Sequence, residues 1–479
     1  MKHWDVQIRQ LAAQSLSVLS VFNPDYIVEK ILTPLLKSCF SKALHVRHGA
    51  ILGVSEIIIG LSGNSVIHRQ QVLEKAFKTL SLKERNLIKE ETENQKKFKV
   101  FYDEISTKNC LQTNLPEGSS QLSSIKTLVD EIEKQRLYRG KGGEIMRAGV
   151  CHFIHSLSQA QIQLEGADLS QLFQTLKENF RHPNFEIQQE STKAFKSFCL
   201  AYFNNSSEEQ LPEDRKFITS EVQKLYTCSM KDDNIAVTRG YNMAFGVLSP
   251  QLLQLLNVEL IETLLKNCIA KGRESDDAET RREATKSLIN VVKTLGIKNI
   301  DSDQLVDILE TMYEALNDYA LDRRGDVGSW VREQTMRSLL QFVETLLDEN
   351  ATADNLHAIQ KLGADKAPFY ERFVGSLLQQ LVEKIDRVRE SAGRQLQFFF
   401  KFHAKNVCDF ASKDHLTALF ISEEKQLPST TTISAATDGK GGALETHQHD
   451  EGIGYLPWRS AEFVFEHIQP FFDAEVYSL

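Results

Sequence analysis

The sequence predicts an all-α protein, a HEAT/armadillo-like α-solenoid of stacked helix pairs. Three observations carry this prediction. Apolar residues recur at helical spacing along most of the chain, only ten prolines occur in 479 residues, and one short motif returns eight times. Convincing alternating strands bounded by turn pairs are not found in the sequence.

Helical periodicity is clearest in five stretches that carry apolar residues at positions i, i+3, i+4 and i+7. They begin at Tyr26, Leu169, Glu259, Gln304 and Phe369. Each predicts an amphipathic helix that buries one face against a neighbour.

The recurring motif is an arginine after an apolar residue or threonine, then a small residue, then an apolar helix face. Seven copies centre on residues that we call the repeat arginines, namely Arg9, Arg47, Arg147, Arg239, Arg281, Arg332 and Arg389. Gln188 takes this place in the eighth copy. Successive positions lie 38, 100, 41, 51, 42, 51 and 57 residues apart, and most spacings are near the roughly 40–47 residues of a HEAT or armadillo unit. The longest gap is expected to hold one further unit and an insertion.

Aspartates precede several of these arginines, at positions 5, 233, 277, 326 and 386. An aspartate just before a helix accepts hydrogen bonds from the first free backbone N–H groups. We therefore expect these residues to cap the second helix of each repeat, and some to pair with arginines of neighbouring repeats.

Changes in composition divide the chain into five segments. We expect HEAT-like repeats at 1–82 and 125–423, separated by a charged, flexible insertion at 83–124. A low-complexity linker follows at 424–454, and 455–479 is expected to begin a further packed, truncated element.

Composition also excludes several classes of protein. The net charge of −9 and the lack of a long basic run argue against nucleic acid as the main partner. The sequence has no run of about 18 apolar residues, so we expect no membrane span. The seven cysteines are scattered without a CxxC pair, which favours free, mostly buried thiols in the cytosol or nucleus.

Motif searches predict neither a catalytic nor a metal site. The GKGG of residues 140–143 lacks the GxxxxGK[ST] pattern of a phosphate-binding loop, so a glycine turn between two helices is expected. HQHDE at 447–451 falls in the linker, without the rigid convergent ligands that a metal needs. We expect no cofactor and no enzymatic activity, because nucleophile–base motifs are also lacking.

Two turns are the candidate partner-binding sites. In the first, Arg136, Tyr138, Arg139 and Lys141 form a cationic and aromatic cluster. The second contains Arg-Gly-Asp in RRGDVGSW, where we expect Asp326 to cap the following helix. Its candidate residues are Arg323, Arg324, Asp326 and Trp330. Bracing between neighbouring helices is the alternative role for both turns.

Two long motifs carry a resemblance to a known family. RLYRGKGGEIMRAGVC at 136–151 and DYALDRRGDVGSWVRE at 318–333 closely resemble blocks of the tubulin-folding cofactor D family. HWDVQIRQLAAQSL, VRHGAILGVSEI, TRGYNMAFGVL and EKIDRVRESA fit the family pattern in order. The resemblance spans roughly residues 3 to 400, with PWRSAEFVFEHI a weaker match. It covers the later half to two-thirds of the family protein, so we expect a chain that lacks the N-terminal repeats.

The resemblance implies a cytoplasmic, microtubule-associated chaperone rather than an enzyme. Family members bind β-tubulin, act with cofactors C and E on the α/β-tubulin heterodimer, and promote GTP hydrolysis by tubulin. They also partner an Arf-like small GTPase. A generic HEAT adaptor scaffold and an inactive fragment remain the alternatives.

Overall fold

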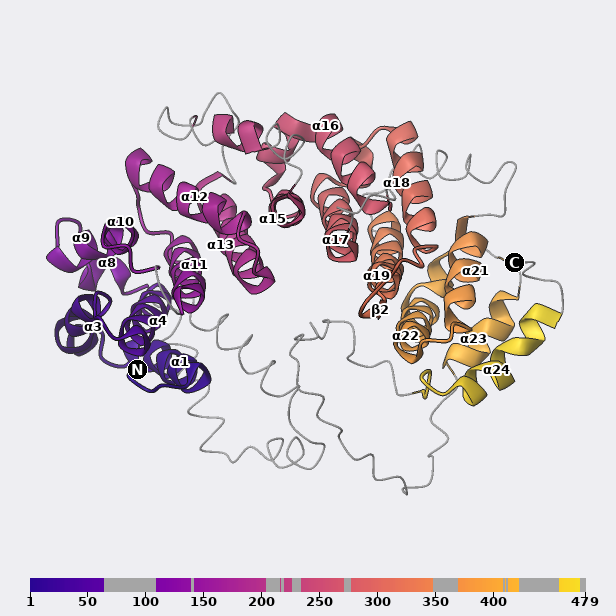
Figure 1. Ribbon diagram of the computed structural model, residues 1–479, viewed down its shortest axis with the longest axis horizontal. Helices are drawn as coiled ribbons and strands as arrows, with labels where there is room; N and C mark the ends of the chain where they lie inside the picture. The colour runs from indigo at the N-terminus through magenta and orange to yellow at the C-terminus, as the bar shows by residue number, and fades with distance from the viewer. Residues whose placement is uncertain are drawn as a thin grey trace, which may run out of the picture. The chain divides into compact units, whose positions relative to one another are not determined.

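Paired helices make up almost all of the regular structure (Figure 1). The computed structural model describes residues 1–63, 109–138, 142–203, 216, 219–225, 234–270, 277–347, 369–407, 410, 412–421 and 456–473. They form two compact units, unit 1 (Met1–Asn257) and unit 2 (Val258–Leu479). The all-α prediction is confirmed.

The repeat motif of unit 1 lies on a series of helices in which each packs against the next. The series is α1 (Val6–Ser20), α4 (Leu44–Leu61), α11 (Gly143–Gln159), α13 (Phe185–Phe203) and α15 (Ile235–Phe245). All positions predicted to carry the motif in this unit are therefore on helices that stack side by side, as repeat physics requires.

The first helices of the repeats make up the rest of the described helices of unit 1. They comprise α2 (Pro24–Tyr26), the π-helix η1 (Ile27–Leu32), α3 (Thr33–Ser38), α8 (Leu111–Asn114), α9 (Ser120–Lys126), α10 (Leu128–Lys134), α12 (Gly166–Phe180) and α16 (Pro250–Cys268). The helix α16 continues into unit 2.

The helix α4 is long and apolar enough to cross a membrane by length and composition, but 83% of that window is buried inside the protein. It packs against both α1 and α11. A helix that is apolar all round is accordingly a core helix here.

Unit 2 repeats the arrangement. Its second helices are α17 (Ala278–Leu295), α19 (Gly328–Leu347) and α22 (Asp386–Phe402). The remaining elements are η3 (Ile297–Asn299), α18 (Ser302–Ala315), β1 (Leu321–Asp322), β2 (Gly325–Asp326), α21 (Phe369–Leu381), η4 (Ala404–Asn406), α23 (Lys413–Ile421) and α24 (Ala461–Asp473). The two short strands form an antiparallel hairpin between α18 and α19.

The predicted caps are confirmed where α1 and α17 begin. Asp5 accepts hydrogen bonds from the backbone of Gln7 and Ile8, and Asp277 does the same for the N–H groups two and three residues after it. Asp386 does not cap, because α22 already begins at this residue and its N-cap is Ile385. Asp233 lies outside the described residues, and Asn234 caps α15.

The predicted flexible insertion at 83–124 overlaps ordered structure. Its last residues, from 109 onward, carry α8 and most of α9. Leu111, Leu115 and Leu122 are buried there, so apolar burial holds a segment whose polar composition alone indicated flexibility. The rest of the insertion and the linker at 424–454 lie outside the described residues.

Candidate functional site

The turn before α19 is a braced hairpin. Leu321 pairs with Asp326 and Asp322 with Gly325, and the N–H of Gly328 donates to the carbonyl of Ala320 at 3.0 Å. Gly325 has a φ of 107°, a conformation that glycine adopts without a Cβ penalty. The Arg-Gly-Asp sequence is therefore a tight turn.

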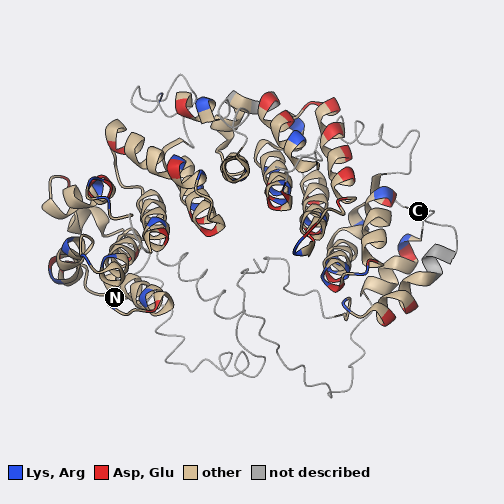
Figure 2. Cartoon of the chain, viewed as in Figure 1, with Lys and Arg blue, Asp and Glu red and all other residues tan. Residues whose placement is uncertain are grey.

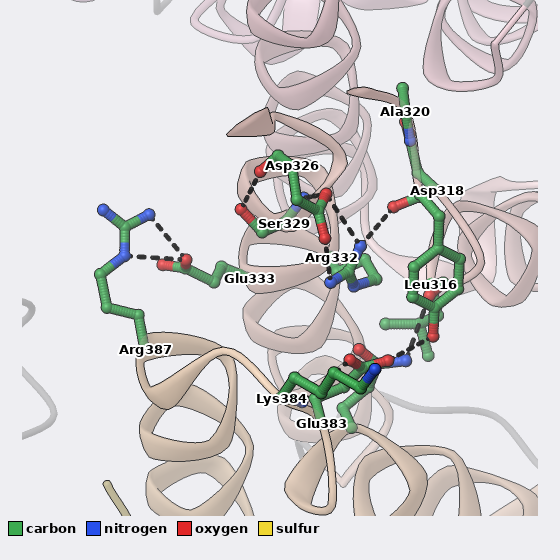
Figure 3. Close-up of polar contacts among 12 residues, drawn as sticks. Leu316, Asp318, Ala320, Asp326, Ser329, Arg332, Glu333, Glu383, Lys384 and Arg387 are labelled. Carbon is green, nitrogen blue, oxygen red and sulfur yellow. Dashed lines mark hydrogen bonds and ion pairs between the residues drawn. The ribbon is translucent and has the colours of Figure 1, made fainter. Parts of the chain in front are cut away.

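Asp326 faces inward from this turn. Its carboxylate accepts from the Ser329 N–H at 3.0 Å, which confirms the predicted capping, and from Nη2 of Arg332 at 3.0 Å (Figure 3). These two bonds fix the Asp326 carboxylate at the start of α19.

Arg332 is the centre of the bracing. Its side chain is fully buried, donates from Nη1 to the carbonyl of Asp318 at 2.6 Å, and lies over the Tyr319 ring at 4.2 Å from the centroid. Charge-assisted bonds of this kind are stronger than neutral ones. They join α19 to the chain that enters the hairpin.

Asp318 extends the bracing to the preceding repeat. Its carboxylate accepts from Nε and Nη2 of Arg281 on α17, at 2.7 and 3.2 Å. Both side chains are at least 95% buried, with exposed fractions of 3% and 5%. This is the predicted Asp–Arg contact between repeats, made by an aspartate that sequence reasoning did not select.

Arg324 lies on the surface of the hairpin but is held in place. It bonds the carboxylates of Asp322 and Glu279, each at 2.9 Å, and its guanidinium lies 4.7 Å from the centroid of the Trp330 ring. Hydrogen bonding to Arg324 also lowers the pKa of the Asp322 carboxyl. Trp330 in turn packs against the small apolar cluster beneath the hairpin.

Arg323 is the remaining cation of this turn and is exposed. Within the described part of the chain it makes no hydrogen bond or ion pair. The hairpin thus presents the guanidinium of Arg323 to solvent, and Leu321 and Tyr319 of the same segment are also exposed.

The turn before α11 joins α10 to α11, so the predicted helix–turn–helix junction is confirmed. Gly142 has a φ of 87° at the N-cap of α11, as a glycine turn requires. Arg139 and Lys141 lie outside the described residues. Arg136 is exposed and has a φ of 56°.

Tyr138 does not share the exposure of Arg136. Its ring receives the guanidinium of Arg147 at 4.7 Å, and its hydroxyl is buried without a hydrogen-bond partner. Burial raises the pKa of that hydroxyl. The geometry gives Tyr138 a packing role against α11.

The other repeat arginines also brace, mostly through backbone carbonyls. Arg9 donates to His3 and Trp4, Arg47 to Ser41, Lys42 and Leu137, and Arg389 to Glu383, Lys384 and Arg459. Each therefore fastens the turn before its own helix, and the last two also reach the next element. At Arg9, Arg47 and Arg389, backbone carbonyl groups therefore take the place of the aspartate partners that the sequence predicted.

Charged residues are otherwise dispersed over the helices of each unit (Figure 2). The acidic residues of α18 include Asp303, Asp307, Glu310 and Glu314. Among the described residues, histidine, cysteine and carboxylate side chains form no group of three or more that could hold a metal ion. Five cysteines in the described part are free thiols, four of them buried.

Stacked helix pairs fastened by arginines define the class of this protein as an α-helical repeat scaffold. Residues 371–479 match the family model of the tubulin folding cofactor D C-terminal domain. The chain is also 25% identical to the Tubulin-specific chaperone D of Dictyostelium discoideum over 483 residues, covering 88% of this chain and 31% of that protein. The resemblance to the cofactor D family is confirmed, and the chain spans about a third of the length of this relative.

A crystal structure of an engineered protein matches 82% of this chain and 96% of its own, at 14% identity. The TM-score is 0.28, so this likeness does not define a shared fold.

Proposed function

We propose that the chain is a tubulin-folding cofactor that binds β-tubulin and takes part in assembling and taking apart the α/β-tubulin heterodimer. The similarity to a tubulin-specific chaperone along 88% of the chain supports this proposal most directly. A repeat scaffold suits the task, because extended stacked surfaces hold a large partner without a deep pocket.

The exposed guanidinium of Arg323 is the proposed contact point. Arg324, Asp326 and Trp330 hold the hairpin beneath it, so the charge is presented with little loss of side-chain and loop freedom on binding. Tubulin is acidic, and complementary charge favours its encounter with this surface. Arg136 supplies a second exposed cation, on unit 1.

In this proposal the chain has no active site of its own and acts by binding its partner. In this proposal it works with cofactors C and E and an Arf-like small GTPase, and it stimulates GTP hydrolysis on tubulin's own nucleotide. Hydrolysis changes the balance of contacts and releases the subunit. The proposed location is the cytoplasm, with association with microtubules.

Co-purification tests the core of the proposal. The recombinant chain, shown to be helical by circular dichroism, is mixed with tubulin and run on a size-exclusion column. We expect a stable complex. Its absence with a folded chain would favour an inactive fragment, and binding of unrelated proteins with equal affinity would favour a generic adaptor.

Charge reversal tests the hairpin. Arg323→Glu is expected to weaken tubulin binding by about fivefold or more, since an exposed ion pair contributes up to about 1 kcal/mol and reversal adds repulsion. Lys298→Glu is the matched control, an exposed cation of the same unit away from the hairpin. Equal affinity of the two variants, measured by interferometry, would remove Arg323 from the interface.

A further inference from the structure

The second helices of unit 2 share one face that the core leaves unburied. Counting from the repeat arginines of α17, α19 and α22, the side chains at positions +1, +5, +9 and +12 are half-buried or exposed, and the residues between them are buried, Gln395 excepted. Spacings of three and four place these positions on one side of each helix. The three helices pack side by side in chain order (Figure 1), so their unburied sides form one surface, which we call the second-helix face.

Cations predominate on the second-helix face. Its twelve positions hold three carboxylates, three uncharged side chains and six cations, which are Arg282, Lys286, Lys293, Arg337, Arg394 and Lys401. The first helix α18 has the opposite character, with four carboxylates and no lysine or arginine (Figure 2). An acidic partner is therefore attracted to the second helices and repelled by α18.

One position carries a cation in all three repeats. Position +5 is Lys286 in α17, Arg337 in α19 and Arg394 in α22, and we call these residues the basic row. In unit 1 the same position varies, from Leu52 in α4 to Lys193 in α13. Packing between repeats does not require this pattern, because like charges on neighbouring helices repel one another. A chain of negative charges bound along the row would turn that repulsion into attraction.

Two carboxylates of the second-helix face take part in contacts with the element that follows. Glu333 accepts from Nη2 of Arg387 at 2.9 Å, which ties α19 to the start of α22. Glu390 bonds Arg394 of the basic row and also Arg459. Such negative groups beside the row disfavour a nucleic acid, which carries a charge on every nucleotide. They are compatible with a partner whose negative charges are spaced apart.

The distance between the helices indicates the spacing of those charges. The axes of packed helices lie about 8–10 Å apart. A polyproline II segment has three residues per turn and rises about 3.1 Å per residue, so every third side chain points the same way and recurs after about 9 Å. A β-strand would instead place side chains three residues apart on opposite faces. Polyproline II geometry therefore matches one carboxylate to each helix.

We propose that the basic row binds an acidic segment of a partner protein, laid across α17, α19 and α22 in polyproline II conformation with a carboxylate at every third residue. The surface and the chemistry of the segment follow from unit 2 alone. Only the identification of the partner as tubulin rests on the proposed function.

A proline-rich peptide supplies such a segment in a defined form. The probe is a fluorescein-labelled peptide of five Glu-Pro-Pro units, and its reference has the same composition with the five glutamates in one block. Binding to the full chain is measured by fluorescence anisotropy at low ionic strength, where exposed ion pairs are least screened. We expect the spaced peptide to bind about fivefold more tightly, because a block of five spans two cations of the row and the spaced glutamates reach all three.

Two triple variants test whether the basic row carries this binding. Lys286→Gln, Arg337→Gln and Arg394→Gln together should weaken binding of the spaced peptide at least tenfold. The matched control should change it less than threefold, and it combines substitutions of three exposed lysines of unit 2 outside the second helices, namely Lys298→Gln, Lys384→Gln and Lys405→Gln. Equal affinity for the two peptides, equal losses in the two triple variants, or no binding by a chain shown to be helical would overturn the proposal.

A single substitution keeps the test decisive if the triple variant fails to fold. Arg337→Gln removes the central cation and should weaken the spaced peptide about fivefold, whereas Arg337→Lys should retain its affinity. Equal affinity of the glutamine variant and the unmodified chain would overturn the proposal. So would a thymidine oligonucleotide that binds more tightly than the spaced peptide and loses affinity with Arg337→Gln.

The peptide and tubulin measurements separate this inference from the proposed function. Failure of tubulin to co-purify, while the spaced peptide still binds through the basic row, would remove the proposed function and support the row as a site for acidic segments. A tubulin complex together with equal binding of the two peptides would overturn the inference alone.

Discussion

At the scale of single residues, buried arginines dominate the chemistry. They sit in the repeat motif, yet the partners described for them include carbonyl oxygens, two aspartates and a histidine of the same chain. Burying a guanidinium is costly unless it is hydrogen-bonded or paired with an opposite charge. The motif is therefore explained first by fold stability.

Arg332→Ala tests this at the most buried position. The substitution leaves the Asp318 carbonyl and the Asp326 carboxylate without their cation, and breaking a buried pair costs about 3–5 kcal/mol. We expect a strong fall in the urea midpoint of unit 2. Arg323→Ala, on the exposed part of the same hairpin, should leave the midpoint nearly unchanged. Similar midpoints for the two variants would contradict the bracing role.

His48 makes unit 1 sensitive to acid. Burial, followed by the charges of Arg9 and His152, lowers its pKa to about 4, and its Nδ1 accepts from Nε of Arg9 at 3.1 Å. The unfolded chain binds this proton near pH 6.5 and the folded chain does not, so stability is lost as the pH falls from 6.5 to about 4. The loss is about 3 kcal/mol by the pKa difference.

His48→Asn keeps an acceptor for Arg9 but does not titrate. We expect urea midpoints of this variant to fall less between pH 6.5 and 4 than those of the unmodified chain. Parallel pH profiles would show that another group carries the acid sensitivity.

At the scale of elements, the segment before α24 docks on α22 by close approach. Trp458 is 2% exposed, lies against Gly393, and donates from its indole to Gln397 at 3.2 Å. Arg389 adds a hydrogen bond to the carbonyl of Arg459. A glycine at position 393 is what allows the ring to reach the helix.

Gly393→Ala is expected to displace Trp458, since a Cβ would overlap its ring. Overpacking of this kind costs about 1–3 kcal/mol. A red shift of tryptophan emission and a lower melting temperature would report the change. In a Trp458→Ala background the same substitution should be neutral or stabilising, because alanine is the better helix former. Equal effects in the two backgrounds would show that the contact is unimportant.

At the scale of the whole molecule, the chain divides into two compact units within α16. Each contains its own series of packed second helices and its own buried core. Repeat proteins derive their stability from contacts between neighbours. A cut between neighbouring helices within a unit therefore removes contacts on which that unit's stability depends.

Expression of residues 1–248 and 249–479 as separate proteins tests this division. Both should be helical and unfold cooperatively, since the cut falls before Pro250 and keeps α16 whole. The control cut after residue 142 separates α4 from α11 and exposes buried residues such as Ile51 and Val150. Aggregation of both pairs of fragments alike would contradict the two-unit description.

The sequence by itself determined the helical class, the position of the repeat motif on every second helix, and the glycine turn at Gly142. These features follow from local periodicity and backbone geometry, which neighbouring residues encode. The family resemblance was also visible there, in two long motifs.

Only the tertiary structure decided which motif residues face inward. Arg323 and Arg324 are adjacent and identical in type, yet Glu279, 45 residues away, holds the second. Tyr138 is half-buried with its hydroxyl inside, while Arg136 is exposed, and Asp318 acquires its partner from α17. Whether a side chain is buried depends on contacts between segments that are distant in the sequence. The short-range pattern of residues does not specify those contacts.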